Sequence, residues 1–285
     1  MIMEQLKYIT IYYISSVVES VKLMVQEHYD KPEYNNTLII LNSPVNDQQF
    51  EQLFKVCQLY NNIIYYHLEH KYNQDSYNGS IYQTWDNEYI EYLKKINPNE
   101  IWSMDYNSQF NLRCEQEFGL HVKYKPVRYT TLIKPINNIY NIDKPIDCCL
   151  PGIITCAYFR QDFITNVERN NHFSMTLITQ TKKLSQCIPV LNSCKYILDM
   201  PRVYEIFTQN QVRIFELLCM GYTVCSKKMD INIFPGLIYE WDTIDDLVEI
   251  IKRGEYLHPT EAYKEMTYTD EAYENYINNL IELQS

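Results

Sequence analysis

A stripe of polar side chains on one predicted helix carries the residue types best suited to binding chemistry in this chain. Gln209, Arg213 and Glu216 recur at i, i+4 and i+7, so they share one helix face. A guanidinium recognises phosphate charge, and a carboxylate is a charged hydrogen-bond acceptor. The alternative is a solvated helix face with an Arg213–Glu216 ion pair, worth roughly a few tenths of a kcal/mol. The opposite face is apolar and can pack on a sheet, with Val212, Phe215, Leu218 and Cys219.

The elements expected to position this stripe are a helix, a glycine turn and a strand. Thr208 followed three residues later by Gln211 is a capping-box pattern, which predicts a helix that starts at Gln209. Gly221 predicts the C-terminal end of that helix. The apolar run at 222–226 then predicts a strand. A helix followed by a strand in this way is half of a Rossmann-like layer.

The segment R-I-x-E-L-L-x-x-G-x-x-V-x-S, from Arg213 to Ser226, resembles the nucleotide-binding helix of GT-B-fold glycosyltransferases. In that family a glutamate five residues before the small-residue turn accepts hydrogen bonds from the ribose hydroxyls of a nucleotide sugar. The resemblance implies this role for Glu216, because it stands five residues before Gly221. It also implies that Arg213 is the basic residue of the donor site found in many small members.

Two further segments resemble the same family. N-P-N-E-I-W-S-M-D-Y-N-S at 97–108, followed by F-G-L-H-V-K-Y-K-P-V-R-Y at 118–129, resembles the end of the N-terminal domain in small bacterial and viral members. Pro151-Gly152 and then Arg160 resemble the opening of the C-terminal domain. This likeness implies that Gly152 lets the donor diphosphate approach the backbone and that Arg160 neutralises it. A surface arginine without function is the alternative for Arg160.

Predicted strands and helices alternate along the whole chain, which is typical of parallel β-α-β units in an open α/β sheet. The polar, proline-containing stretch before residue 147 is expected to separate two domains. The expected fold is therefore α/β, with two Rossmann-like domains that face each other across a cleft, as in GT-B enzymes, and a C-terminal helix that crosses back. The predicted parts are an N-terminal acceptor domain at 1–130, a linker at 131–146, a C-terminal donor-nucleotide domain at 147–260 and a helical segment at 261–285. Strands are expected at 7–14, 36–41, 62–68, 101–102, 122–124, 147–150, 173–179, 196–198, 222–226 and 236–239.

Composition narrows the class of protein. A net charge of -11 argues against a broad nucleic-acid-binding surface, which needs clustered lysine and arginine. The nine cysteines are scattered without zinc spacing, so we expect reduced, buried thiols in a cytoplasmic protein. We expect neither a signal peptide nor a membrane span, since no apolar run reaches about 20 residues. The abundance of Tyr, Asn, Ile and Lys indicates a low-GC coding bias, as in a large DNA virus, which would make the location the host cytoplasm. Oligomeric state is not indicated.

The expected function is transfer of a sugar from a nucleoside-diphosphate sugar to an acceptor hydroxyl in glycan synthesis, without a metal or cofactor. The resemblance alone favours a UDP-sugar. An inverting enzyme would need a general base from the N-terminal half, whereas a retaining enzyme can dispense with one. The alternative function is a degenerate GT-B scaffold that binds a nucleotide or a partner, favoured by Lys227 where the family commonly has glutamate. The candidate bases follow predicted strand ends: His67, His70, Asp75 and Asp105, together with Glu69.

Overall fold

The computed structural model describes residues 2–13, 19–41, 47–68, 90–104, 106, 109–119, 121–136, 144–151, 158–178, 184–200 and 211–284. The chain divides into two compact units, Met1–Val127 with Gln284–Ser285, and Arg128–Leu283. Each unit contains its own mainly parallel sheet with helices packed on it. The predicted class, α/β with two Rossmann-like units, is therefore confirmed. The predicted cleft, the returning C-terminal helix and the predicted domain bounds stay predictions.

The first sheet has six strands in the order β1-β2-β3-β4-β5-β6. Strands β2 to β6 are parallel to one another, and β1 runs antiparallel to β2. Strand β1 is not anticipated from the sequence, because its four residues are mostly exposed and carry no clear alternation. The bounds are β1 Ile2–Gln5, β2 Ile9–Tyr13, β3 Thr37–Leu41, β4 Asn62–His67, β5 Glu100–Ser103 and β6 Val122–Tyr124.

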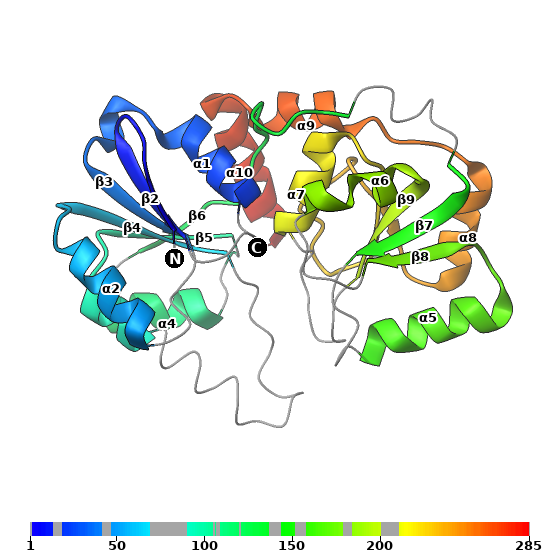
Figure 1. Ribbon diagram of the computed structural model, residues 1–285, viewed down its shortest axis with the longest axis horizontal. Coiled ribbons are helices and arrows are strands. Elements are labelled where there is room, and N and C mark those ends of the chain that lie inside the picture. Colours follow the sequence, from blue (N-terminus) through cyan, green and yellow to red (C-terminus); the bar gives the residue numbers. More distant parts are fainter. Residues whose placement is uncertain are drawn as a thin grey trace. The chain divides into compact units, whose positions relative to one another are not determined.

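Helices cover both faces of the first sheet. Because side chains alternate along a strand, Ile101 and Trp102 of β5 point to opposite faces. Ile101 packs in one core cluster with residues of α2 (Asp47–Cys57), α4 (Gln109–Phe118) and the helical residues 90–96. Trp102 instead contacts Tyr29 of α1 (Glu19–Tyr29), with ring centroids 4.7 Å apart. Figure 1 shows α1 on one side of the strands and α2 and α4 on the other.

The second sheet has five parallel strands in the order β11-β10-β9-β7-β8. Counted from its first strand, this is the order 2-1-3-4-5 of a doubly wound α/β fold. Strand β7 lies between β8 and β9, so the direction of winding reverses there. The first sheet has no such reversal of strand order. The bounds are β7 Ile146–Pro151, β8 Met175–Ile178, β9 Cys194–Asp199, β10 Val224–Lys227 and β11 Tyr239–Trp241.

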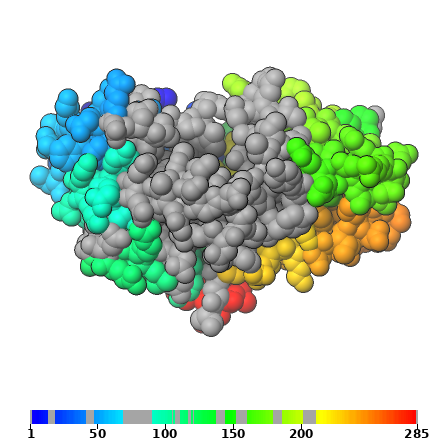
Figure 2. Space-filling model, turned by 90° about the horizontal axis from the view of Figure 1, so that it is seen from below, coloured from blue at the N-terminus to red at the C-terminus, as the bar shows by residue number. Residues whose placement is uncertain are grey.

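One face of the second sheet is covered by α5 (Tyr158–Asn170) and α8 (Ile244–Arg253). Phe163 of α5 and Leu247 of α8 share a core cluster with Tyr196 and Leu198 of β9. Figure 2 shows the outer surface of α5, in green, beside that of α8, in orange. Helix α8 starts with a capping box, in which Thr243 accepts from the backbone of Asp246 and the Asp246 carboxylate accepts in return. The chain between β8 and β9 forms a short 3-10 helix, Leu184–Cys187, and α6, Ile188–Asn192.

Helix α7, Gln211–Met220, follows β9 and precedes β10. Its predicted end at Gly221 is confirmed. Gly221 has φ 92°, and the amides of Gly221 and Tyr222 donate to the carbonyls of Leu218 and Leu217 at 3.1 and 3.0 Å. This is the Schellman arrangement, in which a left-handed glycine lets the chain turn back. The predicted cap, Thr208, and the predicted first residue, Gln209, lie outside the described residues.

The C-terminal segment, predicted to be helical, consists of two helices, α9 (Pro259–Thr267) and α10 (Asp270–Gln284). Arg128 holds the break between them. Its Nε donates to the carbonyl oxygen of Thr267 at 2.9 Å, and its Nη1 lies 2.8 Å from Oδ1 of Asp270. The guanidinium also lies over the ring of Tyr273, 4.3 Å from the ring centroid.

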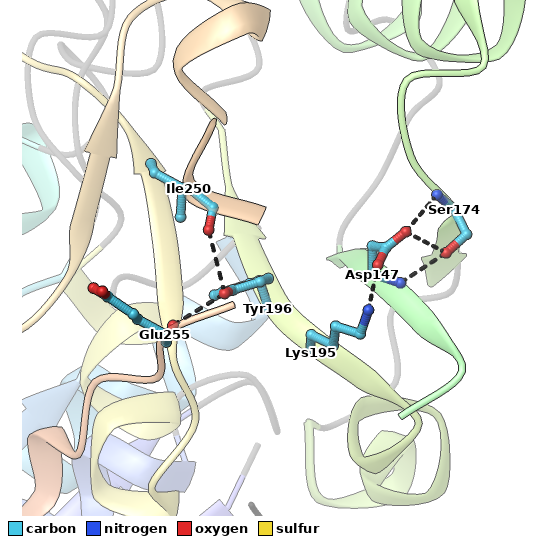
Figure 3. Close-up of polar contacts among 6 residues, drawn as sticks. All are labelled: Asp147, Ser174, Lys195, Tyr196, Ile250 and Glu255. Atoms are coloured by element: carbon cyan, nitrogen blue, oxygen red, sulfur yellow. Dashed lines mark hydrogen bonds and ion pairs between the residues drawn. The ribbon is translucent and has the colours of Figure 1, made fainter. Parts of the chain in front are cut away.

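The amino ends of three neighbouring strands are joined by a polar network (Figure 3). Asp147 of β7 accepts from the amide and the hydroxyl of Ser174, just before β8, at 2.9 and 2.8 Å. Lys195 of β9 donates to Asp147 at 2.7 Å. Partial burial raises the pKa of Asp147, but the hydrogen bonds from Lys195 and Ser174 outweigh it and hold that pKa below its ordinary value. The network ties β7, β8 and β9 together at the amino edge of the sheet.

Candidate functional site

The carboxyl ends of β7 and β9 lie side by side where the winding of the second sheet reverses. After β7 the chain continues to α5, which packs on the sheet face that carries Leu198. After β9 it continues to α7. Ligands of open α/β sheets bind at such a point, because diverging connections leave a crevice beyond the strand ends. The connections themselves, residues 152–157 and 201–210, lie outside the described residues.

An ion pair joins the end of β9 to the first turn of α7. Asp199 is the last residue of β9, and its 1% exposure makes it a deeply buried carboxylate. It alternates with Leu198 and so points away from the face covered by α5 and α8. Nη1 of Arg213 donates to Oδ1 of Asp199 at 3.0 Å, and the arginine side chain is 17% exposed. Arg213 is therefore not part of a solvated helix face, and that alternative is wrong for this residue.

A second arginine reaches the next residue of the chain. Arg160 lies in the first turn of α5 and is 2% exposed. Its Nη2 donates to the carbonyl oxygen of Met200, immediately after Asp199. The alternative of an exposed surface arginine is wrong for Arg160. Two guanidinium groups, one from each helix that follows the central strands, thus bond to consecutive residues at the carboxyl edge.

Glu216 lies one helical turn after Arg213 and is half-buried. Residues three apart on a helix are neighbours on its surface, so Glu216 continues the polar stripe that begins with Arg213. Buried Gln211 occupies the first position of the same helix. We call Arg160, Asp199, Arg213 and Glu216 the carboxyl-edge cluster.

The carboxyl-edge cluster is suited to an anionic ligand that also carries hydroxyl groups. Each guanidinium carries a fixed positive charge and five N–H donors, which suit phosphate oxygens. The N-termini of α5 and α7 add partial positive charge from their backbone N–H groups. Glu216 adds an acceptor on the same side of α7. Phosphate oxygens and sugar hydroxyls are the partners that such a mixture recognises.

The other predicted site residues are not brought into this cluster by the described structure. His67 ends β4 in the first unit, is 3% exposed and stacks on Tyr65 with ring centroids 6.4 Å apart. This packing fits the alternative of a core histidine, and its role as a base stays a prediction. The remaining candidates, Glu69, His70, Asp75, Asp105 and Gly152, lie outside the described residues.

Lys227, which stands where the family commonly has glutamate, has a local partner. Its Nζ bonds to the carboxylate of Asp242, just after β11, and lies 5.6 Å from the centroid of the Trp241 ring. The amide of the next residue, Lys228, donates to the carbonyl oxygen of Trp241 at 2.8 Å. These contacts tie the ends of β10 and β11 together.

Asp199 was not anticipated as a site residue. The sequence does contain a signal for it, since a carboxylate that directly follows the apolar residues 196–198 is carried into the interior by the strand. A buried carboxylate needs a cationic or hydrogen-bonding partner. The first turn of the next predicted helix supplies one cation, Arg213. The sequence pattern therefore indicates that Asp199 needs a cationic partner, and the structure identifies Arg213 as that partner.

Three general properties of the described residues bear on the class of site. They contain no group of three or more His, Cys, Asp or Glu side chains that could hold a metal ion. None of their helices has both the length and the apolar character needed to cross a membrane. The eight cysteines among them are all buried and unbridged, and burial raises the pKa of one such thiol, Cys57, to about 12. These buried, unbridged cysteines agree with the prediction of reduced, buried thiols.

The second unit is thus a doubly wound α/β layer with two arginines at the carboxyl edge of its sheet. No protein family matches the chain, and no curated protein matches it in sequence. The solved structures that match include that of AviGT4, "a glycosyltransferase involved in Avilamycin A biosynthesis", with 10% identity and a TM-score of 0.46. That match covers 87% of this chain and 74% of AviGT4. Because so low a TM-score carries no functional argument, the function is argued from the chain's own residues.

Proposed function

We propose that this protein is a glycosyltransferase that binds a nucleoside-diphosphate sugar at the carboxyl-edge cluster and transfers the sugar to an acceptor hydroxyl. One observation carries the proposal. Arg213 bonds to a buried carboxylate at the point where the winding of the second sheet reverses. It lies one turn before Glu216 on α7. A guanidinium and a carboxylate on one side of a helix, in the order that the GT-B resemblance implies, support the proposed roles of binding phosphate and ribose hydroxyls.

In this proposal Arg160, Arg213 and Glu216 of the cluster each have one role. Arg213 and Arg160 bind the diphosphate, together with the backbone N–H groups at the starts of α7 and α5. Glu216 accepts hydrogen bonds from the two ribose hydroxyls. Gly152, in the connection after β7, lets the backbone approach the diphosphate. The base is proposed to be uracil from the resemblance alone.

The chemistry follows from where negative charge develops. When the acceptor oxygen attacks the anomeric carbon, the bond from that carbon to the diphosphate breaks, and the diphosphate leaves with an added negative charge. Fixed positive groups near that charge stabilise the transition state more than the ground state. The two arginines and two helix N-termini supply this stabilisation, so we propose that no metal is obligatory. The base that removes the acceptor proton is not assigned.

A second candidate function is binding of a nucleotide without turnover. It is favoured by Lys227, which is bonded to Asp242 where many family members have a glutamate. The two functions share the donor site and differ only in turnover. Reduced thiols and the coding bias support the proposal that either function operates in the cytoplasm, that of the host if the source is a large DNA virus.

Calorimetric titration with UDP-, GDP- and dTDP-sugars tests the donor site, and release of free nucleoside diphosphate tests turnover. We expect binding of at least one nucleotide sugar and a slow release that acceptor glycans accelerate. Chelation of divalent ions should leave that release unchanged. Binding without release under any condition would favour the second candidate. A folded protein that binds no nucleotide at millimolar concentration would contradict both.

A further inference from the structure

The Asp199–Arg213 pair poses a physical question about the donor site. A carboxylate next to a phosphate-binding arginine has two opposite effects on an anionic ligand. It competes with the phosphate for the guanidinium and repels its charge. It also holds the guanidinium in one orientation, so that less rotamer freedom is lost when the phosphate binds. The structure favours the second effect for three reasons.

The first reason is burial. Asp199 is 1% exposed and the Arg213 side chain is 17% exposed, so the carboxylate is the more deeply enclosed partner of the pair. The second reason is geometry. The bond runs from Nη1 of Arg213 to Oδ1 of Asp199, so the carboxylate fixes one end of the guanidinium plane. The third reason is that both residues belong to regular elements. Asp199 lies on strand β9 and Arg213 on helix α7, so the backbone of each residue is held in place.

A second ion pair, more exposed than the Asp199–Arg213 pair, lies at the other edge of the same sheet. Asp147 and Lys195 also join a carboxylate to a cation, at the amino ends of β7 and β9. Nζ of Lys195 lies 2.7 Å from Oδ1 of Asp147, a distance similar to the 3.0 Å between Nη1 of Arg213 and Oδ1 of Asp199. The amino edge is remote from the crevice in which ligands of such sheets bind. This pair therefore serves as a structural control for the first.

We propose that Asp199 is a positioning residue that orients Arg213 for the diphosphate of the donor, so that the site discriminates nucleoside diphosphates from free nucleosides. The proposal rests on the donor site proposed above. Asp199 itself touches no phosphate. Its contribution is to hold the guanidinium in one orientation, so that less rotamer freedom is lost when the diphosphate binds.

The test compares the affinities of UDP and uridine for the full-length protein and four variants, Asp199→Asn, Asp199→Ala, Arg213→Met and the control Asp147→Asn. Asparagine keeps a neutral acceptor, about half as strong as a charged one, so we expect about a threefold loss of UDP affinity. Alanine removes the anchor, and we expect a loss of about tenfold. Uridine affinity should stay within twofold throughout, roughly the scatter of such measurements. Where the alanine variant does not fold, the asparagine variant carries the test.

The double variant Asp199→Asn/Arg213→Met excludes a merely structural role. If Asp199 acts through Arg213, its substitution has no further effect on UDP affinity once the arginine is gone. Asp147→Asn should change neither affinity. Tighter UDP binding by Asp199→Asn would overturn the inference, since Asp199 would then be a competitor. Equal losses for UDP and uridine, or a loss that persists without Arg213, would overturn it as well.

The outcomes also separate this inference from the proposed function. If the wild-type protein binds UDP no better than uridine, the proposed donor site fails. If the wild-type protein prefers UDP and Asp199→Asn behaves like Asp147→Asn, the donor site stands and only the positioning role fails.

Discussion

The guanidinium of Arg213 and the carboxylate of Asp199 meet at 3.0 Å although fourteen residues separate them in sequence. The carboxylate is buried and the arginine largely so, which distinguishes this pair from an exposed helical pair such as Lys252–Glu249 on α8. Exposed pairs contribute little because water solvates both charges. Removing one partner of a buried pair leaves the other charge without compensation. This contrast underlies the predictions for α7.

Arg213→Met should destabilise the fold as well as weaken donor binding. The substitution leaves Asp199 buried without its bond from Nη1, and we expect a loss of about 3 kcal/mol in the free energy of unfolding. Lys252→Met is the matched control on an exposed helix, with an expected loss below about 1 kcal/mol. Urea unfolding of both variants measures the difference. Equal, small losses would show that the buried pair contributes no more than an exposed one.

Glu216→Gln should weaken binding of the donor nucleotide without lowering the stability of the fold. A neutral amide replaces the carboxylate proposed to accept from two ribose hydroxyls, so we expect a loss of about 1.5–3 kcal/mol of binding, or ten- to hundredfold in affinity. Calorimetry with UDP and with uridine measures it, and both ligands should lose affinity because both carry the ribose. The control Glu249→Gln, on α8, should bind both normally. Unchanged isotherms for folded Glu216→Gln would move the donor site off α7.

Arg128→Met should be among the most destabilising single substitutions in the second unit. It removes the buried donors to Thr267 and Asp270 and the contact with the Tyr273 ring, so we expect a loss of about 3–5 kcal/mol. Asp270 is 67% exposed, and Asp270→Asn should cost only about 1 kcal/mol. Urea unfolding followed by tyrosine fluorescence compares the two. A loss in the free energy of unfolding for Arg128→Met no larger than that for Asp270→Asn would contradict the role of Arg128 in holding the break between α9 and α10.

Asp147 should make stability depend on pH in the acid range. Because its folded-state pKa is lowered, its ionised form stabilises the fold above its unfolded-state pKa of about 3.9. That contribution is lost as pH falls through the still lower folded-state pKa. The stability difference between wild type and Asp147→Asn should therefore be constant from about pH 6 to 8 and shrink below about pH 4.

Unfolding of both proteins at a series of pH values checks this behaviour. Lys195→Met is the companion variant. Its loss of stability relative to wild type should shrink over the same acid range, because Asp147, the partner of Lys195, becomes protonated. A deficit of Asp147→Asn that grows as the pH falls would contradict the assigned direction of the pKa shift.

Local sequence patterns identify most elements of this fold. Apolar runs such as 36–41 and 62–68 predict β3 and β4 to within a residue or two, because buried parallel strands need a continuous apolar stretch. The capping box at Thr243 and the glycine at Gly221 mark helix ends through backbone chemistry that acts over a few residues. Strand β1 is missed and β11 is predicted about two residues early, because short edge strands have little apolar pattern.

The sequence by itself also determined that Arg213 and Glu216 share one helix face, because helical periodicity alone puts them on one stripe. Their proposed roles toward a nucleotide sugar come from the GT-B resemblance. Only the tertiary structure decided what Arg213 and Arg160 contact. Strand order, helix packing and strand alternation together bring Asp199 to Arg213 and Met200 to Arg160. Such contacts join residues fourteen and forty positions apart. Periodicity sets the face of each element, whereas partners across elements depend on how the whole sheet is wound.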